Sequence, residues 1–288
     1  MTQKHLGTKA KIRIEKERER RIATVVMTLT AIVIIFASSL AVYQSIKSTN
    51  PNEEPKNPKA VIVDQLSLSI PNQTFAQKAK VILTEAGYAV DYYPGEKVTV
   101  NFYRNLATYG YKLIILRVHS ALGSTGKPPL ALFTSELYSA SKYLSEQLYD
   151  QVTKVAFNPE IYGDSNSYFG IMPDFVRYSM NGKFDGAAII MMGCDGIPHL
   201  GGDLRYVGMA KAFVEKGAKV FISWSGPVLG SYSDTATIHL LQNLITEKQT
   251  VKKAVEDTMM EVGSDPMYKS QLQFYPREAE NVEINWSF

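Results

Sequence analysis

The chain has 288 residues, of which 45% are hydrophobic and 20% charged, an ordinary composition for a folded protein. Its formal net charge of +3 is unevenly placed. Residues 1–21 carry eight Lys or Arg against three Glu, whereas the rest of the chain carries 23 Lys or Arg against 25 Asp or Glu. The basic character belongs to the first 21 residues, so the remainder gives no reason to expect a nucleic-acid-binding face.

Residues 22–43 predict a membrane-spanning helix directly after the basic segment. They contain no charged residue and are rich in Val and Ile, and at about 1.5 Å per residue they span roughly 33 Å, enough to cross a bilayer core. By the positive-inside rule, residues 1–21 form a basic cytoplasmic tail, residues 22–43 the signal anchor of a single-pass cell-membrane protein, and the C-terminal domain is extracytoplasmic. The alternative is a cleaved signal peptide, with Ala37 and the two serines after it as the cleavage site.

Residues 44–59 predict a solvated linker, because three prolines stand there among Asn, Glu and Lys. The folded domain is expected over residues 60–288. Its first part alternates apolar runs with helical periodicity, which predicts strands at residues 60–63, 88–93 and 112–118 and helices at 74–85 and 102–108. Such alternation predicts a parallel sheet with helices on both faces.

The second part of the domain is less regular at first. Within residues 130–182 we expect a strand at 153–157, a loop at 162–168 and a short helix at 173–180. Beyond it, apolar runs predict buried strands within residues 186–196 and at 218–224, with a helix at 208–216 between them. Asp234 and Thr250 are expected to cap helices that run to about residues 245 and 262.

Two reactive side chains come at the ends of predicted strands. Cys194, the only cysteine, follows one buried strand, and His119 follows another. Functional groups of an open parallel α/β sheet gather beyond the carboxyl ends of its strands, so we expect the thiol and the imidazole on the same edge. Gly193 and Gly196 bracket the cysteine in a turn where backbone N–H groups can face developing negative charge. The alternatives are an inert buried cysteine and a structural histidine.

The order of these residues resembles the caspase-like cysteine peptidases of clan CD, which include caspases, gingipains, clostripain and the CHAT domains. In that family the general-base His follows the third core strand and the nucleophilic Cys follows the fourth, as His119 and Cys194 do here. The run from Gly-Ala to Ser-Trp at residues 217–224, and the polar run at 234–237, are similar to the gingipain and CHAT pattern. The resemblance implies a three-layer α/β/α sandwich with a mainly parallel sheet.

The resemblance also implies a cysteine endopeptidase acting on a peptide or protein substrate. His119 would take the thiol proton, and the sulfur of Cys194 would attack a peptide carbonyl to give a thioester that water hydrolyses. Backbone N–H groups of Gly193, Cys194 and Ser120 would form the oxyanion hole. Ser120 departs from the family, which has Gly directly after the catalytic His.

Three further residues are candidates for binding the substrate. Trp224 and Ser225 would line the pocket for the residue before the scissile bond, and Asp195 would bind a cationic side chain or orient His119. Caspases have an arginine at the position of Ser225, so specificity for aspartate is not expected.

Other interpretations remain open. A metal site could use Cys194, His199 and His119, but catalytic zinc needs three ligands in matching geometry, and we expect no metal and no other cofactor. The serious rival is a catalytically inactive caspase-like domain that binds a peptide or partner, with Ser120 as the sign of lost catalysis. Alkylation would separate the two, because a catalytic thiol is expected to react well below its ordinary pKa of about 8.5.

Overall fold

The structure is a computed structural model that describes residues 57–123, 126–197 and 207–284. Its contacts divide the chain into Met1–Lys56 and Asn57–Phe288. The predicted tail, signal anchor and most of the linker therefore lie outside the described residues, as does His199. Within the described ranges, none of the helices has the length and apolar character that a bilayer crossing requires.

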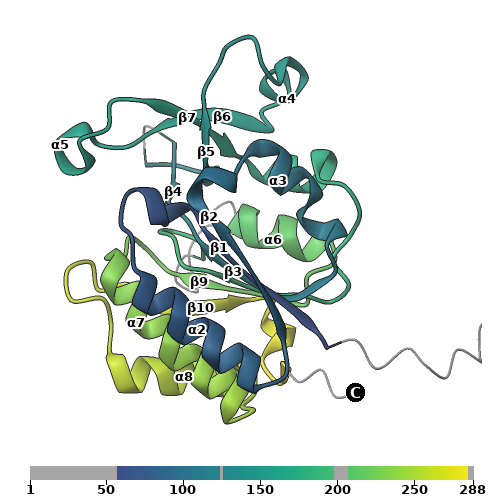
Figure 1. Cartoon of the computed structure of the whole chain (residues 1–288), viewed down its shortest axis with the longest axis vertical. Coiled ribbons are helices and arrows are strands. Elements are labelled where there is room, and N and C mark those ends of the chain that lie inside the picture. Colours follow the sequence, from purple (N-terminus) through teal and green to yellow (C-terminus); the bar gives the residue numbers. More distant parts are fainter. Residues whose placement is uncertain (1–56, 124–125, 198–206, 285–288) are drawn as a thin grey trace, which may run out of the picture. The chain divides into compact units, whose positions relative to one another are not determined.

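The framework of the second unit is sheet A, whose strands follow the order β10-β9-β8-β3-β1-β2 (Figure 1). Its strands are β1 (Lys59–Asp64), β2 (Ala89–Pro94), β3 (Tyr111–Arg117), β8 (Ala188–Met191), β9 (Val220–Trp224) and β10 (Leu272–Tyr275). All neighbours are parallel except β9 and β10 at one edge. The prediction of a mixed α/β domain with a mostly parallel sheet is confirmed.

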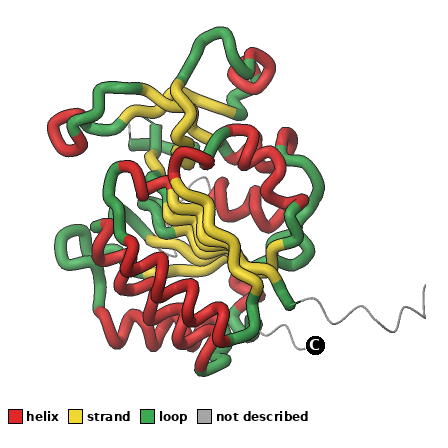
Figure 2. Tube along the Cα trace, in the orientation of Figure 1, coloured by secondary structure: helices red, strands yellow, loops and turns green. Residues whose placement is uncertain are grey.

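Helices cover both faces of sheet A (Figure 2). One face packs against α2 (Gln73–Glu85), α7 (Gly230–Leu241) and α8 (Val251–Val262), and the other against α3 (Val100–Asn105) and α6 (Gly208–Glu215). Successive residues of β1 alternate between them, with Ile62 in the first cluster and Val61 in the second. Strands buried on both faces need apolar residues throughout, which explains the unbroken apolar runs.

A second, antiparallel sheet was not predicted. Sheet B has the order β4-β5-β7-β6, formed by β4 (Ser120–Ala121), β5 (Ala131–Leu137), β7 (Ser167–Ile171) and β6 (Val152–Ala156). The expected strand at residues 153–157 corresponds to β6. β4 begins three residues after β3 ends, so the first strand of sheet B directly follows the carboxyl end of β3, where His119 lies.

The remaining helical segments are short. They are η1 (Gln65–Leu68), η2 (Gly95–Lys97), η3 (Leu106–Thr108), α4 (Leu144–Leu148), α5 (Pro159–Tyr162), η4 (Phe175–Ser179), η6 (Gln242–Thr246) and η7 (Arg277–Ala279). η4 lies within the helix expected at residues 173–180 and forms a single π-type turn. Thr250 caps α8 as expected, since its side chain accepts from the Lys253 N–H.

A buried ionic network lies where sheet A meets α7. Arg117, at the end of β3, donates to Asp64 at 2.7 Å and to both carboxylate oxygens of Asp234 at 2.7 and 2.8 Å. Asp234 also accepts from Asn72. The prediction that Asp234 caps a helix is wrong: α7 begins at Gly230, and the carboxylate four residues later neutralises the buried guanidinium.

Candidate active site

His119 lies just beyond β3, and the segment after β1 holds it in place. Its backbone N–H donates to Gln65 Oε1 at 3.0 Å, and its Nε2 lies 3.3 Å from Ser69 Oγ. β1 is the neighbour of β3 in sheet A, so both contacts come from the adjacent strand end. The loop after β1 therefore fixes the backbone and the ring of His119 together.

Aromatic rings of sheet B enclose the imidazole. The ring centroids of Phe133 and Phe157 lie 5.8 and 4.9 Å from that of His119. Burial, and after it the positive charge of Arg117, lower the pKa of His119 to about 4. The imidazole is therefore uncharged at neutral pH, the form in which it can accept a proton.

Cys194 follows β8 in a turn that packs closely against the segment after β3. Ser120 Oγ donates to the carbonyl oxygen of Cys194 at 2.6 Å. Gly193 has no room for a side chain, because an added Cβ would lie 2.6 Å from the carbonyl oxygen of Val118 and closer still to Ser120 Oγ. The glycine is required by this close approach of two backbones, one before the cysteine and one before the histidine.

The sulfur itself faces the loop after β9. The N–H of Val228 points at Sγ with an N···S distance of 3.5 Å. Burial raises the pKa of the Cys194 thiol above its ordinary value, the hydrogen bond from Val228 opposes that shift, and the charges of Asp195 and Asp265 add to it. The resting form is therefore the protonated thiol.

The predicted adjacency of the two strand ends is confirmed, because β3 and β8 pair in parallel, with Leu116 beside Met191. The two side chains have hydrogen-bond partners on opposite sides of this strand pair. The imidazole meets Ser69 on the β1 side, whereas the sulfur meets Val228 on the β9 side. Within the described residues no hydrogen bond joins the sulfur to the imidazole. The structure brings the two backbones together without placing the thiol against its expected base.

Among the described residues, the backbone N–H groups expected to form an oxyanion hole donate to no other residue. Phe133 N–H donates to the carbonyl of His119, and the strand register then makes Ser120 and Leu132 a non-hydrogen-bonded pair, whose N–H groups point away from each other. The Ser120 N–H is thus directed away from β5. Those of Gly193 and Cys194 donate to no other described residue. The serine side chain therefore does not remove the backbone donor that Gly supplies in the family.

The three predicted substrate-binding residues have different positions. Trp224 is fully buried and its indole N–H donates to Ser233 at 2.9 Å, so its side chain lines no surface pocket. Ser225 extends the pairing of β9 with the segment before β10: its N–H donates to the carbonyl of Gln271, and its Oγ accepts from the Gln271 N–H. Asp195 follows the cysteine in a left-handed conformation with φ of 58°. Burial raises the pKa of its carboxyl, and no hydrogen bond joins it to His119.

The sequence interpretation missed Ser69, Val228 and Phe157. Ser69 and Val228 follow β1 and β9, so the rule that selected His119, position beyond a parallel strand end, would have included them. Phe157 follows the predicted strand β6, but its contact with His119 depends on the antiparallel pairing of sheet B, which was not predicted. Among the described residues no three His, Cys, Asp or Glu side chains group as metal ligands.

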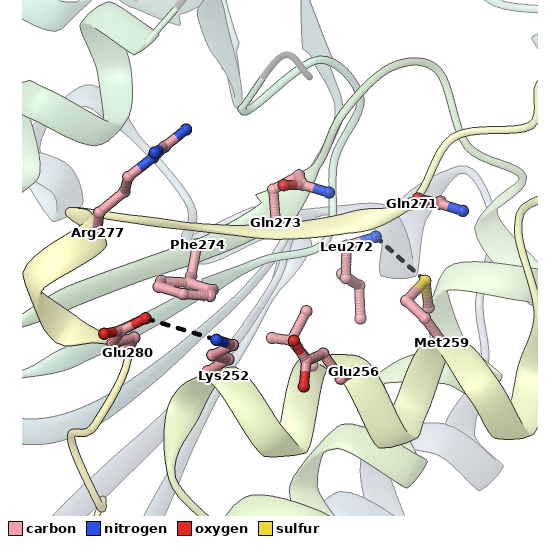
Figure 3. A pocket seen from close by; sticks show the side chains of 10 residues that line it. Lys252, Glu256, Met259, Gln271, Leu272, Gln273, Phe274, Arg277 and Glu280 are labelled. Carbon is pink, nitrogen blue, oxygen red and sulfur yellow. Dashed lines mark hydrogen bonds and ion pairs between the residues drawn. The ribbon is translucent and has the colours of Figure 1, made fainter. Parts of the chain in front are cut away.

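A separate groove of about 360 Å³ lies between α8 and β10 (Figure 3). Val255, Met259, Leu272 and Phe274 form its apolar part. An ion pair between Lys252 and Glu280, 3.7 Å long, crosses one end. None of the predicted site residues lines this groove.

No protein-family model matches the chain, and a search of curated proteins finds no match. An assignment of activity therefore has to be argued from the strand ends, their side chains and their backbone donors.

Proposed function

We propose that the chain is a membrane-anchored cysteine endopeptidase of caspase-like, three-layer α/β/α fold, with Cys194 as nucleophile and His119 as base. Residues 22–43 would anchor it in the cell membrane, with the domain on the extracytoplasmic side and a peptide or protein as substrate. The observation that carries the proposal is that the backbones of His119 and Cys194 meet at the paired ends of β3 and β8, beside N–H groups that donate to no other described residue. The thiol, the imidazole and these N–H groups each have a distinct role in acyl transfer.

The reaction begins from an uncharged pair. The thiol proton passes to the imidazole of His119 as the sulfur attacks the peptide carbonyl. The carbonyl oxygen becomes an oxyanion that the N–H groups of Ser120 and Cys194 would stabilise, an effect typically worth about 3 to 4 kcal/mol per donor. The C–N bond then breaks, and the imidazolium returns its proton to the leaving amine.

The second half of the reaction regenerates the thiol. Water attacks the thioester while neutral His119 accepts one of its protons, and the same oxyanion donors act again. The C–S bond then breaks, the acid product leaves, and the imidazolium returns its proton to the sulfur. Ser69 would act as a positioning residue that holds the ring, since its hydroxyl lies 3.3 Å from Nε2.

The test is cleavage of a peptide library by the full-length chain, read by mass spectrometry. Cleavage is expected for the wild type and should be abolished by Cys194→Ala and by His119→Gln. A matched control is His239→Gln, since His239 pairs with Glu261 between surface helices at 2.8 Å, away from the strand ends. Cleavage that survives Cys194→Ala would refute the proposal.

An inactive caspase-like module that binds a peptide is the second candidate, and specific observations favour it. The imidazole interacts with Ser69 and the sulfur with Val228, with no hydrogen bond between sulfur and imidazole in the part of the chain that the structure describes, and the pKa of the thiol is raised. The discriminating reagent is a peptidyl acyloxymethyl ketone, whose carbonyl needs both a nucleophile and oxyanion donors. An active site should capture it faster than iodoacetamide at neutral pH, whereas a binding module should bind peptides equally well with Cys194→Ala.

A further inference from the structure

Sheet B supplies one wall of the site, through a phenylalanine directly after β6. Phe157 stands edge-to-face against the imidazole of His119, with centroids 4.9 Å apart and planes inclined at 63°. The same ring packs against Phe133 of β5 at 5.1 Å and Tyr168 of β7 at 5.4 Å. Its position is therefore set by three strands of sheet B.

The two rings beside His119 differ in exposure. Phe133 is only 4% exposed and belongs to the small apolar cluster of sheet B, whereas Phe157 is partly exposed and packs against that cluster from outside. Phe157 is therefore the ring that lies nearer solvent. Its removal would admit water to the imidazole, while removal of Phe133 would also open the cluster.

We infer that Phe157 is a positioning residue for His119: its ring shields the imidazole from water, keeping it uncharged and in place beside Ser69. The catalytic meaning of this role rests on the proposed peptidase function, but the shielding does not. An uncharged imidazole is the form that can accept the thiol proton, so sheet B would keep the base ready across the neutral and mildly acidic range. Burial is the larger cause of the lowered pKa of His119.

The charged groups around the imidazole do not provide the shielding from water that we assign to Phe157. Among the described charged groups, Arg117 is the one whose field reaches His119, and it would remain in a Phe157 variant. The other charged groups on the surrounding elements are Asp64 after β1, Asp234 on α7, Asp195 on the cysteine turn, Lys154 on β6 over the Tyr138 ring, and Asp164 bonded to Tyr168. None of these others contributes to the shift at His119.

The experiment is an NMR titration of the full-length chain labelled at the Cε1 atoms of its four histidines. The resonance lost in His119→Gln identifies the imidazole. In wild type its pKa is expected at about 4. In Phe157→Ala we expect a rise of about one unit or more, because water returns to the charged form. Phe157→Leu keeps part of the apolar cover and should give a smaller rise.

The control is Tyr178→Ala, which removes a ring of η4 that is 73% exposed and is not one of the described rings that contact His119, and should leave the titration unchanged. A folded Phe157→Ala protein whose His119 pKa is unchanged or lowered would overturn the inference; lowering would mean that the ring attracts the cation more than it excludes water. Phe157→Leu decides the matter if the alanine variant does not fold. Since the titration uses no substrate, loss of peptidase activity and loss of shielding remain separate results.

Discussion

Replacing Asp234 by alanine tests whether the ionic network below the site holds the strand ends together. Arg117 is fully buried, and the change removes two of its charge-assisted hydrogen bonds, at 2.7 and 2.8 Å. A broken buried ion pair costs about 3 to 5 kcal/mol because the remaining charge stays desolvated. Asp64 still accepts from the guanidinium, so we expect the free energy of unfolding to fall by about 3 kcal/mol, at the low end of that range.

The assay is urea unfolding at pH 7 followed by circular dichroism, with the slope fixed from wild type. Asp257→Ala is the matched control, because it removes a helical carboxylate that pairs at 2.7 Å with the exposed Lys253 and should leave stability almost unchanged. If Asp234→Ala proves no less stable than this control, Arg117 must reach water or another acceptor, and the network does not support the site.

Three further results are expected. Because the pKa of His119 is lowered to about 4, the imidazole of the unfolded chain takes up a proton between pH 7 and pH 5 while that of the folded chain stays uncharged. Over this range the free energy of unfolding of wild type should therefore fall by about 2 kcal/mol relative to that of His119→Gln, measured in parallel urea titrations. Gly193→Ala should cost about 1 to 3 kcal/mol in the same assay, and Ser120→Gly should not rescue it, since the Val118 carbonyl still blocks the methyl group. Because the pKa of Cys194 is raised, iodoacetamide at pH 7 should alkylate the folded chain more slowly than the urea-unfolded chain, and equal rates would contradict this.

Sheet A could be predicted because its signal is local. β3 and β8 are unbroken apolar runs, and a strand can be apolar throughout only if both of its faces are covered. The alternation of such runs with helices then leaves few arrangements other than a parallel sheet. From that sheet the shared edge of His119 and Cys194 followed directly.

Sheet B could not be predicted in the same way. β5 is buried at its start but exposed at its end, where Thr134, Ser135 and Glu136 interrupt any apolar run. β4 contains only two residues, too few for a periodicity to exist. These strands form because they pair with other strands, and pairing with a segment distant in sequence produces no local sequence pattern.

Asp234 shows a related limit. A polar residue before an apolar helical pattern is typical of a cap, but the same carboxylate can also form an ion pair with a buried arginine, here Arg117. Tertiary neutralisation of a buried charge is worth more than a cap, so the helix starts earlier and Asp234 lies within it. Sequence spacing does not show whether Asp234 caps a helix or pairs with a buried arginine.

Strand order likewise fixes where the thiol and the imidazole emerge, but not where they point. That choice belongs to the loops after β1 and β9, which supply Ser69 and Val228. Because the pKa of His119 is lowered to about 4 and burial raises that of the Cys194 thiol, the resting state favours the uncharged pair over a thiolate and an imidazolium. Catalysis would require the proton to move as the carbonyl is attacked and its oxygen reaches the N–H donors. Slow alkylation of the resting thiol is thus expected of both the peptidase and the inactive module, so the alkylation test suggested by the sequence does not separate them, whereas a substrate-like carbonyl does.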